Sequence, residues 1–261
     1  MLIKFYKYQG TGNDFVLIDN RTSQFDRSNN KLVKNLCDRR FGIGGDGLIL
    51  LQYTTQNILE MVYYNADGNE SSMCGNGGRC FVQFAKDLDL FSSSITFTAP
   101  DGLHNAYIEE DLIHLKMNDV EKIENIASDY FLNTGSPHLV SFVSDIQNFD
   151  VVEKGRHLRY SDSFKPKGTN VNFVEREGNA LWVRTYERGV EDETYSCGTG
   201  VTAAAIVAQS HGFFSPVDII TKGGNLKVSF EKMEEKFTNI YLIGPAVKVF
   251  EGEIARSKFD D

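Results

Sequence analysis

Short apolar runs separated by turn residues dominate this chain. In the first half they predict strands at residues 4–8, 15–19, 48–52, 59–64, 94–98, 103–109 and 112–117. In the second half they predict strands at residues 170–176, 180–187, 217–221, 226–230 and 238–243. Residues 28–39 instead have helical spacing, with apolar residues on one side at Leu32, Val33, Leu36 and Cys37. Both halves are therefore expected to be rich in strands and to contain few helices.

Each half also contains one apolar helix that follows a cysteine. The first helix comes after Cys74-Gly75-Asn76-Gly77 and the second after Cys197-Gly198-Thr199-Gly200. The two cysteines are 123 positions apart, and so are Thr98 and Thr221 in the strand that follows each helix. A repeat of this length indicates two similar domains rather than a solenoid.

A second pair of strings supports the repeat, since Gly10-Thr11 with Phe15-Val16 resembles Gly168-Thr169 with Phe173-Val174. The predicted fold class is α+β, with two pseudo-symmetric domains, each a curled and mostly antiparallel sheet or barrel around a central helix. We expect the domains to cover residues 1–119 and 120–250, with residues 251–261 as a candidate segment for completing the first. Equivalent points on such domains can face each other, so we expect the active site in the cleft between them.

Composition narrows the class of protein. The 261 residues are 41% hydrophobic and 24% charged, as in a globular protein, and a net charge of −9 argues against a nucleic-acid partner. The chain has no apolar run of 18 residues and no secretion signal at its start, so we expect no membrane contact and a cytoplasmic location. The four cysteines are then expected to be reduced, and the scattered histidines predict no metal site.

The chemistry of the cysteine motifs follows from their position. A cysteine just before a helix faces unpaired backbone N–H groups and the positive end of the helix dipole, which favour thiolate over thiol. Inverting a carbon that bears an acidic hydrogen needs a base on one face and an acid on the other. Cys74 and Cys197 in opposite protonation states would do this without a cofactor. A substrate carboxylate could rest on the N–H groups of Gly75-Asn76 and Gly198-Thr199.

Other motifs are less specific. Gly42-x-Gly44-x-x-Gly47 follows a helix and precedes a strand, which is the reverse of a dinucleotide fingerprint, so we interpret it as a turn. Glu187 and Arg188 could bind an ammonium and a carboxylate together. His138 follows Gly135-Ser136-Pro137 and could lie near the cleft. A nucleophilic triad of Cys197, His138 and an aspartate stays open, but it leaves Cys74 unexplained.

With these residues in view, the chain closely resembles the diaminopimelate epimerases over nearly its whole length. The resemblance is carried by motifs in matching order, namely Gly10-Thr-Gly-Asn-Asp-Phe-Val, Gly42-Ile-Gly-Gly-Asp-Gly, Tyr64-Asn-Ala-Asp-Gly, Met73-Cys-Gly-Asn-Gly-Gly-Arg-Cys, Gly135-Ser-Pro-His, Tyr186-Glu-Arg-Gly-Val, Ser196-Cys-Gly-Thr-Gly and Gly244-Pro-Ala. It implies a cofactor-independent, homodimeric enzyme that interconverts LL- and meso-diaminopimelate for lysine and peptidoglycan synthesis.

The resemblance also implies roles for individual residues. Cys74 and Cys197 match the acid–base pair, and Gly75-Asn76 and Gly198-Thr199 match the groups that hold the reacting carboxylate. Further matches are the substrate-binding asparagines and the pair that holds the far end of the substrate, at Asn13, Asn65, Asn170, Glu187 and Arg188. His138 matches a histidine near the reacting centre, with Ser136 beside it.

Two residues depart from the pattern. Ser136 stands where an asparagine often precedes the Pro-His pair, and Gly47 stands where a glutamine can touch substrate, so these two contacts are in question.

Three alternatives to a diaminopimelate epimerase stay open. Proline and hydroxyproline racemases share the two-thiol logic but not the need for Glu187-Arg188, and isomerases of the phenazine-biosynthesis type are not expected to carry both cysteines. A binding protein or thiol redox switch could instead use Cys74 and Cys197 as a disulfide pair.

Overall fold

The computed structural model describes residues 2–71 and 73–259. The chain forms two compact units. Unit 1 consists of Met1–Leu115 with Pro245–Asp261, and unit 2 is Lys116–Gly244. The chain therefore passes between the units a few residues before the boundaries expected from the sequence at 119/120 and 250/251.

The strands of unit 1 pair in the order β17-β1-β2-β3-β4-β5-β6-β7. Their bounds are β1 Leu2–Gly10, β2 Asn13–Asp19, β3 Gly47–Tyr53, β4 Leu59–Asn65, β5 Ser94–Ala99, β6 Gly102–Glu109, β7 Leu112–Lys116 and β17 Val247–Ala255. Pairs β2–β3 and β4–β5 are parallel and the others are antiparallel. The C-terminal strand β17, which the sequence pattern does not predict, completes this unit by pairing with β1.

The strands of unit 2 pair in the order β8-β9-β10-β11-β12-β14-β15-β16, and β13 adds to β12. Their bounds are β8 Glu124–Ile126, β9 Asp129–Asn133, β10 Pro137–Phe142, β11 Asn170–Glu177, β12 Ala180–Glu187, β13 Asp192–Thr194, β14 Val217–Thr221, β15 Gly224–Met233 and β16 Lys236–Gly244. Pairs β10–β11 and β12–β14 are parallel. Every strand predicted from the sequence is present, whereas β8, β9, β10 and β13 were not predicted.

The two strand orders correspond one to one, which establishes the repeat at the level of topology. Strand β2 corresponds to β10 and β3 to β11, because the register pairs Phe15 with Gly47 in unit 1 and His138 with Asn170 in unit 2. The sequence-based match of Gly10-Thr11 with Gly168-Thr169 is therefore wrong. The turn before β2 corresponds instead to the turn before β10, so positions 11, 13, 15, 47 and 74 correspond to positions 134, 136, 138, 170 and 197.

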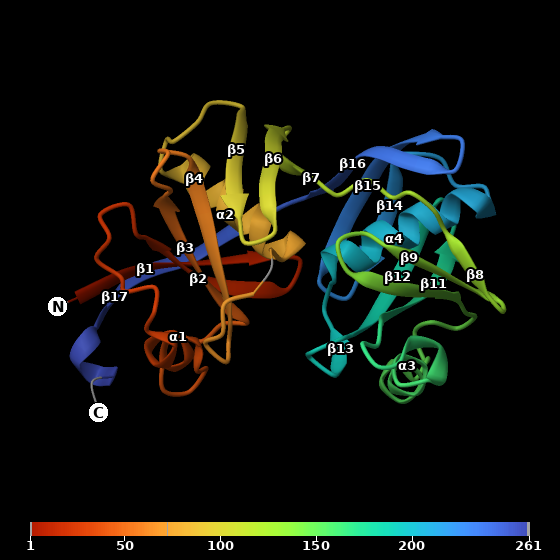
Figure 1. Ribbon diagram of the computed structural model, residues 1–261, viewed down its shortest axis with the longest axis horizontal. Coiled ribbons are helices and arrows are strands. Elements are labelled where there is room, and N and C mark those ends of the chain that lie inside the picture. Colours follow the sequence, from red (N-terminus) through yellow and green to blue (C-terminus); the bar gives the residue numbers. More distant parts are fainter. Residues whose placement is uncertain (1, 72, 260–261) are drawn as a thin grey trace. The chain divides into compact units, whose positions relative to one another are not determined.

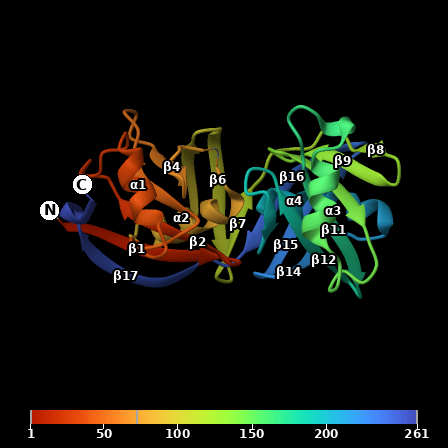
Figure 2. The same ribbon diagram turned by 90° about the horizontal axis from the view of Figure 1, so that it is seen from below.

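Each unit has an inner helix and an outer helix. The inner helices are α2 (Gly75–Asp87) and α4 (Gly198–Ala208), which follow the two cysteines, and Figure 1 shows each surrounded by the strands of its own unit. The outer helices are α1 (Asn30–Cys37) and α3 (Val151–Arg159), which Figure 2 shows in front of the strands. Short 3-10 helices lie at Asp162–Phe164, Gln209–His211 and Arg256–Phe259. Measured against the thickness of a bilayer, each helix in the described part of the chain is too short or too polar to span it.

Helix α3 is a feature that the sequence pattern missed. Its N-terminus carries a recognisable signal, because the Asp150 side chain accepts a hydrogen bond from the Glu153 N–H at 3.0 Å. Its apolar face is weak, with only Val151 and Gly155 buried. The helix predicted at residues 28–39 is present but shorter, since the Asn29 side chain caps it and Cys37 ends it.

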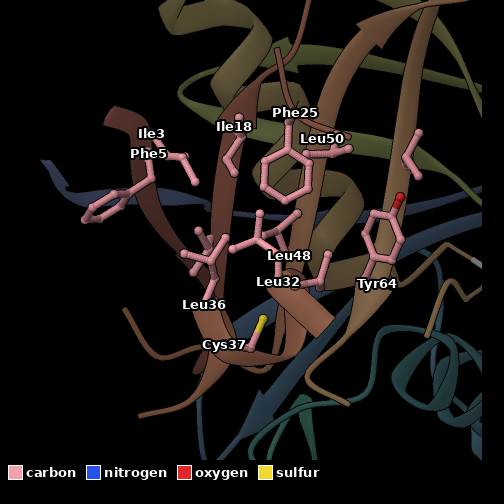
Figure 3. Close-up of a cluster of buried hydrophobic side chains, with 13 residues drawn as sticks. Ile3, Phe5, Ile18, Phe25, Leu32, Leu36, Cys37, Leu48, Leu50 and Tyr64 are labelled. Carbon is pink, nitrogen blue, oxygen red and sulfur yellow. The ribbon is translucent and has the colours of Figure 1, made fainter. Parts of the chain in front are cut away.

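Alternation along each strand decides which helix it contacts. Leu48 and Leu50 of β3 pack with Leu32 and Leu36 of α1 in the cluster drawn in Figure 3. The intervening Ile49 points to the opposite face, where its Cδ1 atom lies near Gly77 of α2. Helix α4 is buried almost all round, and its Ala-rich sequence lets the surrounding strands approach closely.

Candidate active site

Both cysteines of the repeated motif occupy the N-cap of an inner helix. Cys74 precedes Gly75 at the start of α2, and Cys197 precedes Gly198 at the start of α4, each with an extended backbone. Neither sulfur caps its own helix by a hydrogen bond. Each thiol therefore lies beside N–H groups of a first helical turn, where a negative charge is stabilised.

The cysteines elsewhere in the chain are different. Cys37 and Cys80 are buried, and burial raises the pKa of each thiol to about 12. These two side chains are neutral parts of the core, as their apolar surroundings in the sequence indicated.

In unit 1 the site residues beyond Cys74 include a hydrogen-bonded pair of asparagines. The Asn76 amide donates to the Asn13 side-chain oxygen, and the Asn13 amide donates to Asp46 Oδ2 at 3.0 Å. The turn between α1 and β3 holds Asp46, because Arg39 binds both Asp46 (2.7 Å) and Asp14 (2.6 Å). This turn contains the Gly42–Gly47 string and confirms its interpretation as a turn.

Arg79 lies behind these residues and was missed by the sequence analysis. It is fully buried on α2 and donates to Asn76 Oδ1 and Thr11 Oγ1, both at 3.0 Å. It also donates to the backbone oxygens of Gly75 and Pro245. Burial lowers the pKa of Arg79 to about 10, and interaction with the Cys80 and Cys74 sulfurs opposes this shift. The guanidinium thus keeps its charge at neutral pH.

The other two unit 1 positions from the resemblance lie side by side. Asn65 ends β4 and is exposed, and the register pairs it with Gly47 at the start of β3. A side chain at position 47 has no room, since a Cβ atom would lie 2.5 Å from the Tyr64 carbonyl oxygen and 2.7 Å from the Tyr63 ring. The departure from glutamine at this position therefore has a steric reason.

In unit 2 a histidine and a threonine connect to Cys197. The Thr199 hydroxyl lies 3.6 Å from Cys197 Sγ and 2.9 Å from His138 Nε2. The Thr134 hydroxyl donates to the Thr199 carbonyl oxygen at 2.9 Å and holds the backbone. Burial, together with the nearby charge of Arg188, lowers the pKa of His138 to about 3, so the imidazole is neutral.

Two buried side chains behind His138 were also missed. The Asn172 amide lies 3.1 Å from His138 Nδ1 and donates to the Leu139 carbonyl oxygen at 2.9 Å. The Thr185 hydroxyl donates to Asn172 Oδ1 at 2.9 Å. The sequence carried little signal for Asn172, because it alternates with Val171 and Phe173 in β11 as a solvent-facing residue would, although the structure buries it.

The remaining unit 2 positions from the resemblance form a second group, close to where β11 begins and the antiparallel strand β12 ends. The Asn170 amide donates to Ser136 Oγ at 2.9 Å, and Asn170 Oδ1 accepts from the Arg188 N–H at 2.8 Å. The Arg188 guanidinium is half-buried and reaches Ser136 Oγ at 3.5 Å. Glu187 is half-buried at the end of β12. Ser136 therefore connects Asn170 to Arg188, whatever its contact with a substrate.

The described residues contain no group of three or more His, Cys, Asp or Glu side chains that could hold a metal ion. Each unit by itself therefore presents one thiol at a helix N-terminus with polar side chains around it. The residues from the sequence analysis that contact one another are Asn13 with Asn76 in unit 1, and in unit 2 Cys197 with Thr199, Thr199 with His138, and Asn170 with Ser136 and Arg188.

Comparisons with known sequences give a consistent result. The diaminopimelate epimerase family model matches residues 5–123 and 130–249 of this chain. A diaminopimelate epimerase of Flavobacterium psychrophilum is 54% identical over 257 residues, which cover 97% of this chain and 100% of that protein. A diaminopimelate epimerase of Aquifex aeolicus is 37% identical over an alignment of 280 positions, which covers 97% of this chain and 98% of that protein.

Solved structures show the same fold. A phenazine biosynthesis protein of the PhzF family from Bacillus anthracis has a TM-score of 0.78 at 13% identity, with 98% of this chain and 99% of that chain covered. A hydroxyproline epimerase from Agrobacterium vitis has a TM-score of 0.70 at 13% identity, with 98% and 93% covered. At such identities the likeness is one of fold alone, and it confirms the predicted architecture of two similar units with few helices.

Proposed function

Because this chain belongs to the diaminopimelate epimerase family and is an isomerase, we propose that Cys74 and Cys197 are the two acid–base groups of its reaction. The observation that carries the proposal is their equivalent placement, each at the N-cap of the inner helix of its unit. Each of these two thiols lies beside the N–H groups of a first helical turn. Cys37 and Cys80 are instead core thiols, whose pKa burial raises to about 12.

The proposed reaction interconverts LL- and meso-diaminopimelate. One cysteine, as thiolate, removes the proton from the α-carbon, and the electron pair moves into the carboxylate. The other cysteine, as thiol, returns a proton to the opposite face, so the configuration inverts and the two thiols exchange protonation states. No cofactor takes part, because the developing charge is stabilised by N–H groups of Gly75-Asn76 and Gly198-Thr199 at two helix N-termini.

Each thiol has support for a negative charge within its own unit. The Arg79 guanidinium interacts electrostatically with Cys74. The Thr199 hydroxyl is within hydrogen-bond distance of Cys197. A base and an acid that exchange roles need comparable stabilisation in both protonation states, and these arrangements provide it by different means.

The far end of the substrate is assigned to a separate set of residues. Arg188 would bind the distant carboxylate, with Asn170 and Ser136 holding its backbone and guanidinium. Glu187 would bind the distant ammonium. The side chains of Asn13, Asn65 and Asn170 would make further contacts to the substrate. We further propose that the enzyme is a cytoplasmic homodimer.

The decisive experiment is hydrogen exchange from solvent. Purified protein in deuterium oxide should incorporate deuterium at the α-carbon of diaminopimelate while the stereoisomers interconvert. A binding protein or a thiol redox switch would incorporate none. Absence of exchange by reduced, folded protein would overturn the proposed function.

Substrate choice tests the assignment of the far end. Arg188→Met should lower catalytic efficiency toward diaminopimelate by roughly 30- to 5000-fold, because losing a buried charge-paired contact costs about 2–5 kcal/mol. Lysine, which lacks the far carboxylate, should be a very poor substrate of the parent protein. Comparable rates with lysine and diaminopimelate would contradict the role of Arg188 without touching that of the thiols.

A further inference from the structure

A chain of buried hydrogen bonds leads from β12 to the sulfur of Cys197, and its direction can be worked out atom by atom. Its members are Thr185, Asn172, His138 and Thr199. All but Thr199 are buried, so their polar atoms depend on one another rather than on solvent.

The Asn172 amide fixes the direction. The atom that lies 2.9 Å from the Leu139 carbonyl oxygen must be the NH₂ group, because a carbonyl can only accept. The Thr185 hydroxyl donates to the other end of the amide, Oδ1. The second hydrogen of the NH₂ group then points to His138 Nδ1, which lies 3.1 Å away and must accept it.

The orientation of the Asn172 amide also determines which nitrogen of His138 carries the hydrogen. With Nδ1 as acceptor and the ring neutral, the single ring hydrogen is on Nε2 and is donated to Thr199 Oγ1. The Thr199 oxygen is then an acceptor for the histidine, so its own hydrogen is available to Cys197 Sγ at 3.6 Å. A donor aimed at sulfur stabilises thiolate relative to thiol.

We propose that Asn172 is a positioning residue that fixes the Nε2–H tautomer of His138 and thereby directs the Thr199 hydroxyl hydrogen toward Cys197. This inference rests on the proposed role of Cys197 as an acid–base group. The titratable groups that face the imidazole within unit 2 are Arg188, which disfavours a second positive charge, and Cys197, which is reached through Thr199.

Gly200 is part of the same arrangement. A Cβ atom at position 200 would lie 2.3 Å from Asn172 Oδ1. The second glycine of the Cys-Gly-Thr-Gly string therefore leaves the space that the amide occupies. At the equivalent position of unit 1, a Cβ atom added to Gly77 would lie 3.4 Å from Ile49 Cδ1 and from Met61 Cε, so its nearest neighbours there are apolar.

The test reads the tautomer directly by long-range ¹H–¹⁵N NMR of protein with labelled histidine, with the His138 signal assigned from a His138→Gln variant. The parent protein should show neutral imidazole with hydrogen on Nε2. Asn172→Asp, whose carboxylate can only accept, should place a proton on Nδ1. Asn172→Leu, which introduces no charge and no hydrogen-bond partner, should leave the tautomer unfixed, with hydrogen on either ring nitrogen. Hydrogen on Nδ1 in the parent protein would overturn the proposal.

A second readout follows the thiol. In a Cys74→Ala background, the midpoint of the pH profile for alkylation of Cys197 should rise by about one to two pH units in Asn172→Leu, the shift expected for a lost hydrogen bond to a charged group. Thr221→Val, which removes a hydroxyl of a buried threonine bonded to Gly224, is the matched control and should leave the midpoint unchanged.

Equal midpoints in folded Asn172→Leu and Thr221→Val would refute the positioning role. Neither readout requires turnover, so the inference and the proposed function can fail separately. If Cys197→Ala kept its epimerase activity while the tautomer and the midpoint behaved as expected, the proposed function would be wrong and the hydrogen-bond arrangement would still be right.

Discussion

The two units place a cysteine at the same point of the same scaffold and surround it with different chemistry. In unit 1 a buried cation, Arg79, belongs to the first turns of α2, the helix whose N-cap residue is Cys74. The equivalent residue of unit 2 is Thr202, whose hydroxyl donates to the Gly198 carbonyl oxygen at 2.8 Å. Unit 2 relies instead on a neutral chain of hydrogen bonds that ends at Cys197.

This difference shows how one topology can support a thiolate in two ways. A buried charge acts through space and depends little on the orientation of its neighbours. A hydrogen-bond chain depends on every donor pointing the right way. We therefore expect unit 1 to be sensitive to the removal of charge and unit 2 to be sensitive to small displacements of atoms.

The largest expected effect comes from removing either thiol. Cys74→Ala and Cys197→Ala should each lower epimerisation by at least about 100- to 10,000-fold, the usual contribution of an acid–base group. Each variant should keep its fold by circular dichroism, because the substitution is small and removes no cap hydrogen bond. Elimination from a halogenated analogue, which needs one base only, is the control reaction. Near-normal epimerisation by either variant would refute the two-base mechanism.

The next largest effect is expected from removing the buried positive charge of unit 1. Arg79→Met should raise the alkylation midpoint of Cys74 by about 1–3 pH units, because a nearby opposite charge favours thiolate by that amount. The midpoint of Cys197 should not move. Thr202→Val is the matched variant at the equivalent position and should leave both midpoints unchanged. A folded Arg79→Met protein with an unshifted Cys74 would show that the charge does not matter.

A smaller effect is expected from a glycine-to-alanine substitution at the second glycine of each cysteine motif. Gly200→Ala should lower the free energy of unfolding by about 1–3 kcal/mol, since its Cβ would overlap the firmly held Asn172 side chain. Gly77→Ala should be tolerated, because the added Cβ atom would lie 3.4 Å from its nearest neighbours, Ile49 and Met61, which is an ordinary contact distance. Chemical denaturation measures both. Equal losses would mean that the helices themselves, rather than their surroundings, require glycine.

The last comparison concerns how the stability of the two units depends on pH. The folded pKa of His138, about 3, is below its ordinary value of 6.5, so the unfolded chain binds the proton first. The free energy of unfolding should therefore fall by about 1.4 kcal/mol per pH unit as the pH drops from 6.5 toward 3. His138→Phe introduces the residue found at the equivalent position 15 and should remove this slope. The comparison uses slopes, so a uniform loss of stability in the variant does not obscure it.

Unit 1 provides a contrast in the same measurement. Burial alone would raise the pKa of Asp14, but hydrogen bonds from Arg39 and Lys7 hold this pKa at about 2, below its ordinary value of 3.8. This carboxylate therefore stabilises the fold above pH 3.8, and the stabilisation is lost only as the pH falls toward 2. Between pH 6.5 and pH 4, His138 should thus contribute to the slope and Asp14 should not.

Local patterns predicted much of this molecule. The strands at residues 48–52 and 217–221, the helices after both cysteines and the turn at Gly42–Gly47 are all present. Such features arise from residues within a few positions of one another, so their signals are contained in short stretches. Helix α3 was missed because its apolar face is small and its cap is the clearer signal.

The internal repeat shows where local patterns fail. The spacing of Cys74 and Cys197 indicated two similar domains, and that is correct. The match of the turn at Gly10-Thr11 with Gly168-Thr169 was wrong, because similar short strings occur by chance. Strand pairing corrected it, since β2 and β10 hold the same place in their sheets and β11 corresponds to β3.

By itself, the sequence determined the elements, the two thiols at helix N-termini and the family to which the chain belongs. Only the tertiary structure decided which side chains support each thiol. Arg79 reaches Thr11 across 68 positions, and Asn172 reaches His138 across 34. Contacts over such distances depend on which strands pair and in what register, and a polar residue in an apolar stretch does not name its partner. The buried cation of unit 1 and the neutral hydrogen-bond chain of unit 2 therefore became distinguishable only once the strands were in place.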